Sequence, residues 1–165
     1  MSTAPVGDPA PEIALPDDTG TTHRLVDQRG RWTIVYFYPK DDTPGCNVEA
    51  CEFRDANETI HERGADVWGI SPQAAPSKQA FREKFKLPFV LLADVDHAVA
   101  EAYGVWVEKV NYGKKYMGVA RTTFLVDPEG RIARTWSKVK PEGHAADVIA
   151  ALDEAQAATN SVAPR

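Results

Sequence analysis

The sequence has few cysteines, no long apolar run and no excess of positive charge. Its 165 residues include two cysteines, too few for the disulfide framework of a small secreted domain. The longest apolar runs, at residues 34–38 and 89–93, are far shorter than the ~20 residues that cross a bilayer. The formal net charge is −5, whereas general nucleic-acid binders carry a basic surplus. We therefore expect no nucleic-acid partner and no membrane association.

The composition indicates a globular protein of a reducing compartment. Hydrophobic residues make up 43% of the chain, and its length fits one domain over residues 1–165, with a flexible tail from about residue 158. Residues 1–16 show neither the basic segment nor the apolar core of a secretory signal, so we expect a cytoplasmic location. There, two cysteines close in sequence indicate redox chemistry, metal binding or coincidence.

Strand-like and helix-like segments alternate along the chain. Residues 33–38 are β-branched and aromatic throughout, which is typical of a central strand buried on both faces. We expect other strands at 13–15, 22–25, 66–71, 89–92, 122–126 and 131–136, helices at 46–62, 77–86 (Ser77 near its cap), 96–103 and 143–157, and a loop or β-excursion at 109–118. The pattern predicts an α/β fold with a mixed central sheet flanked by helices on both faces.

The start of the helix predicted after the central strand carries the first cysteine. Thr43 suits the N-cap, Pro44 the first helical position and Gly64 the position beyond the last turn. Cys46 then lies in the first turn, where free backbone N–H groups and the helix dipole favour an anion. A thiolate is such an anion, and it is the nucleophilic form of cysteine. The sequence therefore nominates Cys46 as the reactive cysteine.

The second cysteine, Cys51, lies five residues further on. In an intact helix the two Cα atoms would be ~8.6 Å apart, whereas the Cα–Cα distance across a disulfide is usually no more than ~6.8 Å. Either the pair never bonds, or the helix start unwinds whenever it does. Inert cysteines and a redox pair both fit this spacing. A metal site is disfavoured because the four histidines are scattered along the sequence, at His23, His61, His97 and His144.

The run YPKDDTPGCNVEACEFRD resembles the active-site segment of the peroxiredoxins, specifically the bacterioferritin-comigratory-protein or PrxQ subfamily. Pro39, Thr43 and Cys46 meet the core motif Pro-x-x-x-Thr-x-x-Cys, and Cys51 meets the position of the subfamily's second cysteine. Similarity continues through GISPQ, LPFVLLAD, AYGVW and ARTTFLVDPEGRI, and so covers nearly the whole chain. Asn47 stands where a threonine is expected, outside the core motif.

The resemblance implies a thioredoxin-like fold and a thioredoxin-dependent peroxidase that protects the cell against oxidative stress. Cys46 would be the peroxidatic residue and Cys51 the resolving one, joined in an intrachain disulfide during the cycle. The implied substrates are hydrogen peroxide and organic hydroperoxides, and the implied partner is thioredoxin or a similar dithiol reductant. The family requires no cofactor or metal, and the subfamily is often monomeric.

The resemblance also places an active-site arginine at Arg121. Its guanidinium and the backbone N–H groups near Gly45 and Cys46 are suited to stabilise charge on the leaving oxygen of a peroxide. The hydroxyl of Thr43 can donate to the thiolate and accept from the peroxide. We hypothesise that Glu49 orients Arg121.

Two prolines, Pro39 and Pro44, are expected to shape the pocket and to limit its access to water.

An alternative function is a general dithiol–disulfide exchanger on a thioredoxin-like scaffold. Such exchangers usually carry C-x-x-C, whereas four residues separate the cysteines here. A third reading is a non-enzymatic binding module with structural cysteines.

Overall fold

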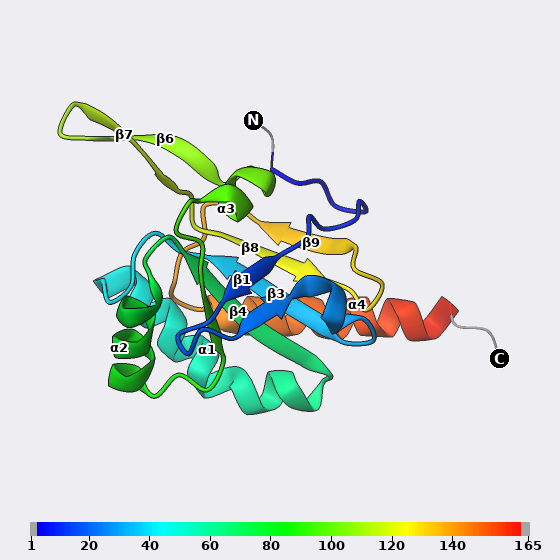
Figure 1. The fold of residues 1–165 in the computed structure, drawn as a ribbon. Helices are drawn as coiled ribbons and strands as arrows, with labels where there is room; N and C mark the ends of the chain where they lie inside the picture. The colour runs from blue at the N-terminus through cyan, green and yellow to red at the C-terminus, as the bar shows by residue number, and fades with distance from the viewer. Residues whose placement is uncertain (1–2, 163–165) are drawn as a thin grey trace.

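A mixed five-stranded sheet forms the centre of the fold (Figure 1). In spatial order its strands are β5 (Val90–Ala93), β4 (Ala65–Ser71), β3 (Trp32–Phe37), β8 (Thr122–Val126) and β9 (Ile132–Trp136). β3 pairs in parallel with β4 and antiparallel with β8. This computed structural model describes residues 3–162. The expected mixed sheet is therefore confirmed.

The strand β3 is buried along its whole length. Its side chains alternate between two hydrophobic cores, as the period of two in a strand requires. Ile34 and Tyr36 point into one core, and Val35 and Phe37 into the other. The prediction of a central strand covered on both faces is confirmed.

Helices and a short hairpin cover the two faces. On one side α1 (Pro44–Glu62), α2 (Ala75–Phe85) and α4 (His144–Val162) contribute Phe53, Phe81 and Leu152 to a shared core. On the other side lie α3 (Ala98–Ala102), the 3-10 turn Leu25–Gln28 and the pair β1 (Ala14–Pro16) and β2 (Thr22–Arg24). In Figure 1, β1 lies in front of the sheet and α4 behind it.

A second hairpin projects from the body of the protein (Figure 1). The segment expected as a loop or β-excursion forms β6 (Trp106–Asn111) and β7 (Lys114–Val119), which pair antiparallel. Tyr112 and Gly113 connect them, and both have positive φ, as a two-residue hairpin turn of the primed type requires.

Some boundaries differ from the sequence-based expectations. The helix α1 does begin at Pro44, the first helical position expected from the sequence. The helix α2 is capped by Ala74 and not near Ser77, whose hydroxyl donates to Asp41 instead. The helix α4 continues to Val162, so residues 158–162 of the expected tail are helical, and the last three residues lie outside the described range.

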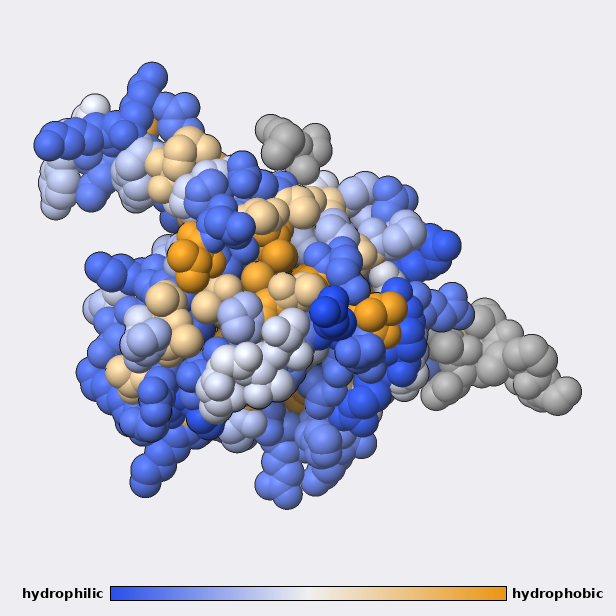
Figure 2. Space-filling model, viewed as in Figure 1, coloured by the Kyte–Doolittle hydropathy of each residue, from blue (hydrophilic) through white to orange (hydrophobic). Residues whose placement is uncertain are grey.

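The surface drawn in Figure 2 is largely hydrophilic, and its hydrophobic residues gather near the middle of that face. Among residues 3–162, no helix is both long and apolar enough to cross a membrane.

Candidate active site

The start of α1 places Cys46 at the end of the central strand. Thr43 is the N-cap residue in extended backbone, and Pro44 opens the helix. The N–H of Asn47 donates to the carbonyl of Thr43 over 2.7 Å, which closes the first turn. A helix start leaves the preceding N–H groups, those of Gly45 and Cys46, without intrahelical acceptors. The first turn therefore offers backbone donors and the positive end of the helix dipole beside the sulfur.

The guanidinium of Arg121 links this turn to the sheet. Arg121 directly precedes β8, and its Nη2 lies 3.3 Å from Cys46 Sγ. Its Nη1 donates to Glu49 Oε1 over 2.7 Å. Among the described residues, the bond from Nη2 is the hydrogen bond that reaches Sγ. A Cβ at Gly45 would lie 3.3 Å from Nη2, so glycine there permits the close approach of the arginine.

Glu49 is an acid held inside the protein. Its side chain is fully buried, and Oε2 has no hydrogen-bond partner among the described residues. Burial raises the pKa of Glu49 from 4.5 to about 7, although Arg121 acts to lower it. The short ion pair alone would favour the carboxylate, but the unpartnered oxygen makes the charge costly. We conclude that burial affects the pKa of Glu49 more than the ion pair with Arg121 does.

Three other residues expected at the site lie in the loop before α1 or at the first position of the helix. The hydroxyl of Thr43 donates to the carbonyl of Lys40 over 3.0 Å, not to the sulfur, so the expected donation to Cys46 is replaced by a bond within the loop. Pro39 is half-buried, and its carbonyl accepts from Gln73 over 3.2 Å. Pro44 is exposed. The structure thus brings Cys46, Arg121 and Glu49 into contact, whereas the Thr43 hydroxyl and the Pro39 carbonyl bond to Lys40 and Gln73.

Cys51 is half-buried and lies in the same uninterrupted helix as Cys46. Neither cysteine is bonded. Five residues of helix separate the Cα atoms by ~7.5 Å along the axis alone, beyond the usual disulfide range. A bond between the two sulfurs therefore requires the first turns of α1 to unwind.

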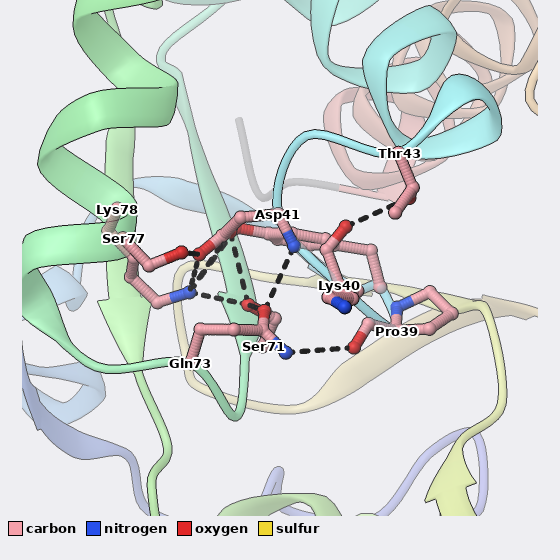
Figure 3. Close-up of polar contacts among 9 residues, drawn as sticks. Pro39, Lys40, Asp41, Thr43, Ser71, Gln73, Ser77 and Lys78 are labelled. Atoms are coloured by element: carbon pink, nitrogen blue, oxygen red, sulfur yellow. Dashed lines mark hydrogen bonds and ion pairs between the residues drawn. The ribbon is translucent and has the colours of Figure 1, made fainter.

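A buried ion pair that the sequence did not indicate joins the loop before α1 to the helix α2 (Figure 3). Lys78 Nζ lies 3.3 Å from Asp41 Oδ1, and their side chains are 0% and 2% exposed. Asp41 lies within the motif Pro-x-x-x-Thr-x-x-Cys, so the sequence places it close to Cys46 along the chain. Nothing in the sequence marks Lys78, because the segment SKQAFREKFK, predicted to be helical, contains two other lysines.

The arrangement is suited to nucleophilic chemistry at sulfur. The charge of Arg121 favours an ionised thiol, and the free N–H groups can stabilise negative charge that develops on an oxygen next to it. Cys46 is itself 2% exposed, so only a small electrophile reaches the sulfur while the helix is intact.

Comparison with known proteins gives consistent matches. The model of the AhpC/TSA family matches residues 6–135. Peroxiredoxin Bcp of Bacillus subtilis is 46% identical over 152 residues, which cover 92% of this chain and 97% of the relative. The putative peroxiredoxin bcp of Coxiella burnetii is 50% identical over 147 residues, or 89% and 97% of the two chains.

Solved structures agree with these relatives. A cysteine-to-serine mutant of Xylella fastidiosa PrxQ superposes with a TM-score of 0.87 at 32% identity and covers 94% of this chain and 99% of that one. The bacterioferritin comigratory protein of Xanthomonas campestris, described by its alkyl peroxide reduction activity, superposes with a TM-score of 0.82 at 39% identity. That match covers 86% of this chain and 90% of the other.

Proposed function

The chain belongs to the AhpC/TSA family, and we propose that it is a thiol peroxidase that reduces hydrogen peroxide and organic hydroperoxides to water and alcohols. The observation that carries the proposal is the contact of Arg121 Nη2 with Cys46 Sγ, 3.3 Å apart at the start of a helix. The relatives named peroxiredoxin over nearly their whole length support it.

In the first step the Cys46 thiolate attacks the terminal oxygen of the hydroperoxide. The S–O bond forms as the O–O bond breaks, and the oxygen moves to sulfur with its hydrogen. The sulfur is oxidised to sulfenic acid, and the peroxide is reduced to an alkoxide that takes a proton from solvent. Arg121 and the N–H groups of Gly45 and Cys46 stabilise the charge on the leaving oxygen. Thr43 accepts from the peroxide through a lone pair, because its proton is donated to Lys40.

In the second step Cys51 resolves the sulfenic acid. The first turns of α1 unwind, the Cys51 sulfur attacks Cys46, and a disulfide forms with release of water. Two electrons from an external dithiol then restore both thiols by disulfide exchange. We propose a thioredoxin-type reductant, and a monomeric enzyme in the cytoplasm, where such a reductant operates.

Three residues would act around this chemistry. Glu49 holds the guanidinium of Arg121 by its 2.7 Å contact and thereby fixes the second N–H group on the sulfur. Pro39 and Pro44 bound the loop and the helix start, where they limit the entry of water.

The test is rapid mixing of the fully reduced protein with hydrogen peroxide or an alkyl hydroperoxide, with acid quenching at intervals, labelling of the unfolded protein by a thiol-blocking reagent, and mass spectrometry. We expect rapid loss of the Cys46 thiol in the wild type and none above background in Cys46→Ser. Oxidation no faster than that of a free thiol with the same ionised fraction would refute the assignment. An exchanger would instead react with disulfides and not with peroxide.

A further inference from the structure

We propose that Lys78 and Asp41 are positioning residues for Cys46: their buried pair anchors the loop over residues 39–43 and so keeps the first turn of α1 wound against Arg121. The inference rests on the proposed peroxidase cycle, because it assigns the pair opposite effects on its two chemical steps. Loss of the anchor would slow the reaction with peroxide and speed the closure of the disulfide.

The ammonium group of Lys78 is completely enclosed and fully hydrogen-bonded. It donates to Ser71 Oγ, to the Tyr38 hydroxyl over 3.4 Å and to both carboxylate oxygens of Asp41 over 3.3 and 3.4 Å. An ammonium has three N–H groups, and these acceptors use all of them. Burial lowers the pKa of Lys78 from 10.5 to about 8, against the opposing effect of Asp41. Asp41 therefore helps the lysine to keep its charge near neutral pH.

The carboxylate of Asp41 gathers donors from three elements (Figure 3). It accepts from Tyr38, directly after β3, over 2.5 Å and from Ser77 in α2 over 2.8 Å. Ser71 Oγ at the end of β4 lies 3.3 Å from it and shares its single proton with Gln73. These contacts fasten one point of the loop to the rigid part of the fold, since β3 and β4 are adjacent central strands.

The backbone of the same loop is held by Gln73. The N–H of Asp41 donates to Gln73 Oε1 over 2.9 Å, and Gln73 Nε2 donates to the carbonyl of Pro39 over 3.2 Å. Gln73 also accepts from Ser71 over 2.7 Å. The side chain and the main chain of the loop thus share one connected network.

The anchor lies close enough to the sulfur to control it. Asp41 lies three residues before the start of α1 at Pro44, and Asp42 between them has a left-handed backbone, with φ of 55°. Thr43 then caps the helix through its carbonyl. While Asp41 is fixed, the chain leading to Cys46 has little freedom, and this restraint opposes the unwinding of the first turn.

A buried ion pair is not the most stable way to fill this space. Apolar residues of the same volume often give an equal or more stable fold, which implies a role for the pair beyond stability. Fixing one loop conformation among several is such a role, and a reacting group misplaced by about 1 Å can lose ~10²-fold in rate.

The experiment compares Lys78→Met with Lys84→Met. Lys84 lies in the same helix and contacts the same loop through an exposed pair with Asp42, 2.9 Å long. Hydrogen exchange of the reduced proteins is followed by mass spectrometry. The two oxidation steps are timed by rapid mixing with peroxide followed by quenching. A double variant, Asp41→Asn with Lys78→Met, keeps the volume and leaves no unpaired buried charge, in case the single variant does not fold.

We expect amides of residues 41–50 to exchange at least ~10-fold faster in Lys78→Met and in the double variant, with peptides of β3 and β8 unchanged. Oxidation by peroxide should fall ~10- to 100-fold, while conversion of sulfenic acid to disulfide becomes faster. Lys84→Met should match the wild type in all three. Unchanged exchange in residues 41–50, or equally faster exchange in β3 and β8, would overturn the proposal. Exchange needs no turnover, so a wild type that ignores peroxide would refute the proposed function and leave this test intact.

Discussion

Replacing Glu49 with glutamine should change how the stability of the reduced protein depends on pH. The pKa of Glu49 is raised from 4.5 to about 7 by burial, so between these values the folded protein keeps a proton that the unfolded chain has lost. Rising pH therefore lowers the free energy of unfolding of the wild type across this interval. Glutamine has no such proton. At ~1.36 kcal/mol per pH unit, Glu49→Gln should gain up to about 3 kcal/mol relative to the wild type from pH 4.5 to 7.

The assay is urea unfolding followed by circular dichroism at several pH values, with a reductant present. Glu58→Gln is the matched control, because it removes an exposed carboxylate from the same helix. The test uses only the pH dependence of the difference in free energy of unfolding between Glu49→Gln and the wild type. The loss of the contact with Arg121 lowers stability by a constant amount and does not affect that dependence. A difference in free energy that stays flat would show that the ion pair with Arg121 offsets burial, and one that falls as pH rises would show that it outweighs burial; either result would refute the raised pKa.

The remaining predictions concern the chemistry at sulfur. Cys51→Ser should leave the first oxidation at the wild-type rate and let sulfenic acid accumulate, detected by a sulfenic-acid trap and mass spectrometry; a disulfide that still forms would place the resolving thiol on another chain. Arg121→Ala should slow oxidation by roughly 10²-fold, whereas Arg134→Ala, a change on strand β9, should not; an equal rate in both would confine Arg121 to a structural role. Thr43→Val should slow oxidation about fivefold or more, the value of one hydrogen bond near 1 kcal/mol, with Thr43→Ser close to the wild type; equal rates for all three proteins would remove the hydroxyl from the mechanism.

Local sequence patterns predicted the framework of the site. The apolar run at residues 33–38 defined the central strand, and Thr43 with Pro44 defined the helix start two residues before Cys46. These predictions depend on short-range effects, namely side-chain period, proline geometry and the dipole of the first turn. The contact between Arg121 and Cys46 spans 75 residues, and it was expected only from the resemblance to a known family.

The burial of Lys78 could not be predicted, because it depends on how α2 packs against the ends of two strands. In sequence, Lys78 and Lys84 look alike, yet their side chains are 0% and 58% exposed. The direction of the Thr43 hydroxyl was also missed. It follows from the path of the loop, which brings the carbonyl of Lys40 within 3.0 Å.

The enclosure of Cys46 makes its reactivity selective by size. A hydroperoxide can meet the sulfur of a residue that is 2% exposed when a bulky maleimide cannot, so the two reagents report different populations of the same reduced protein. Labelling by the maleimide proceeds only through transient openings of the helix start, and its rate divided by that of an unstructured peptide gives their equilibrium constant. Accidental thiol modification in a crowded solution is suppressed by the same factor.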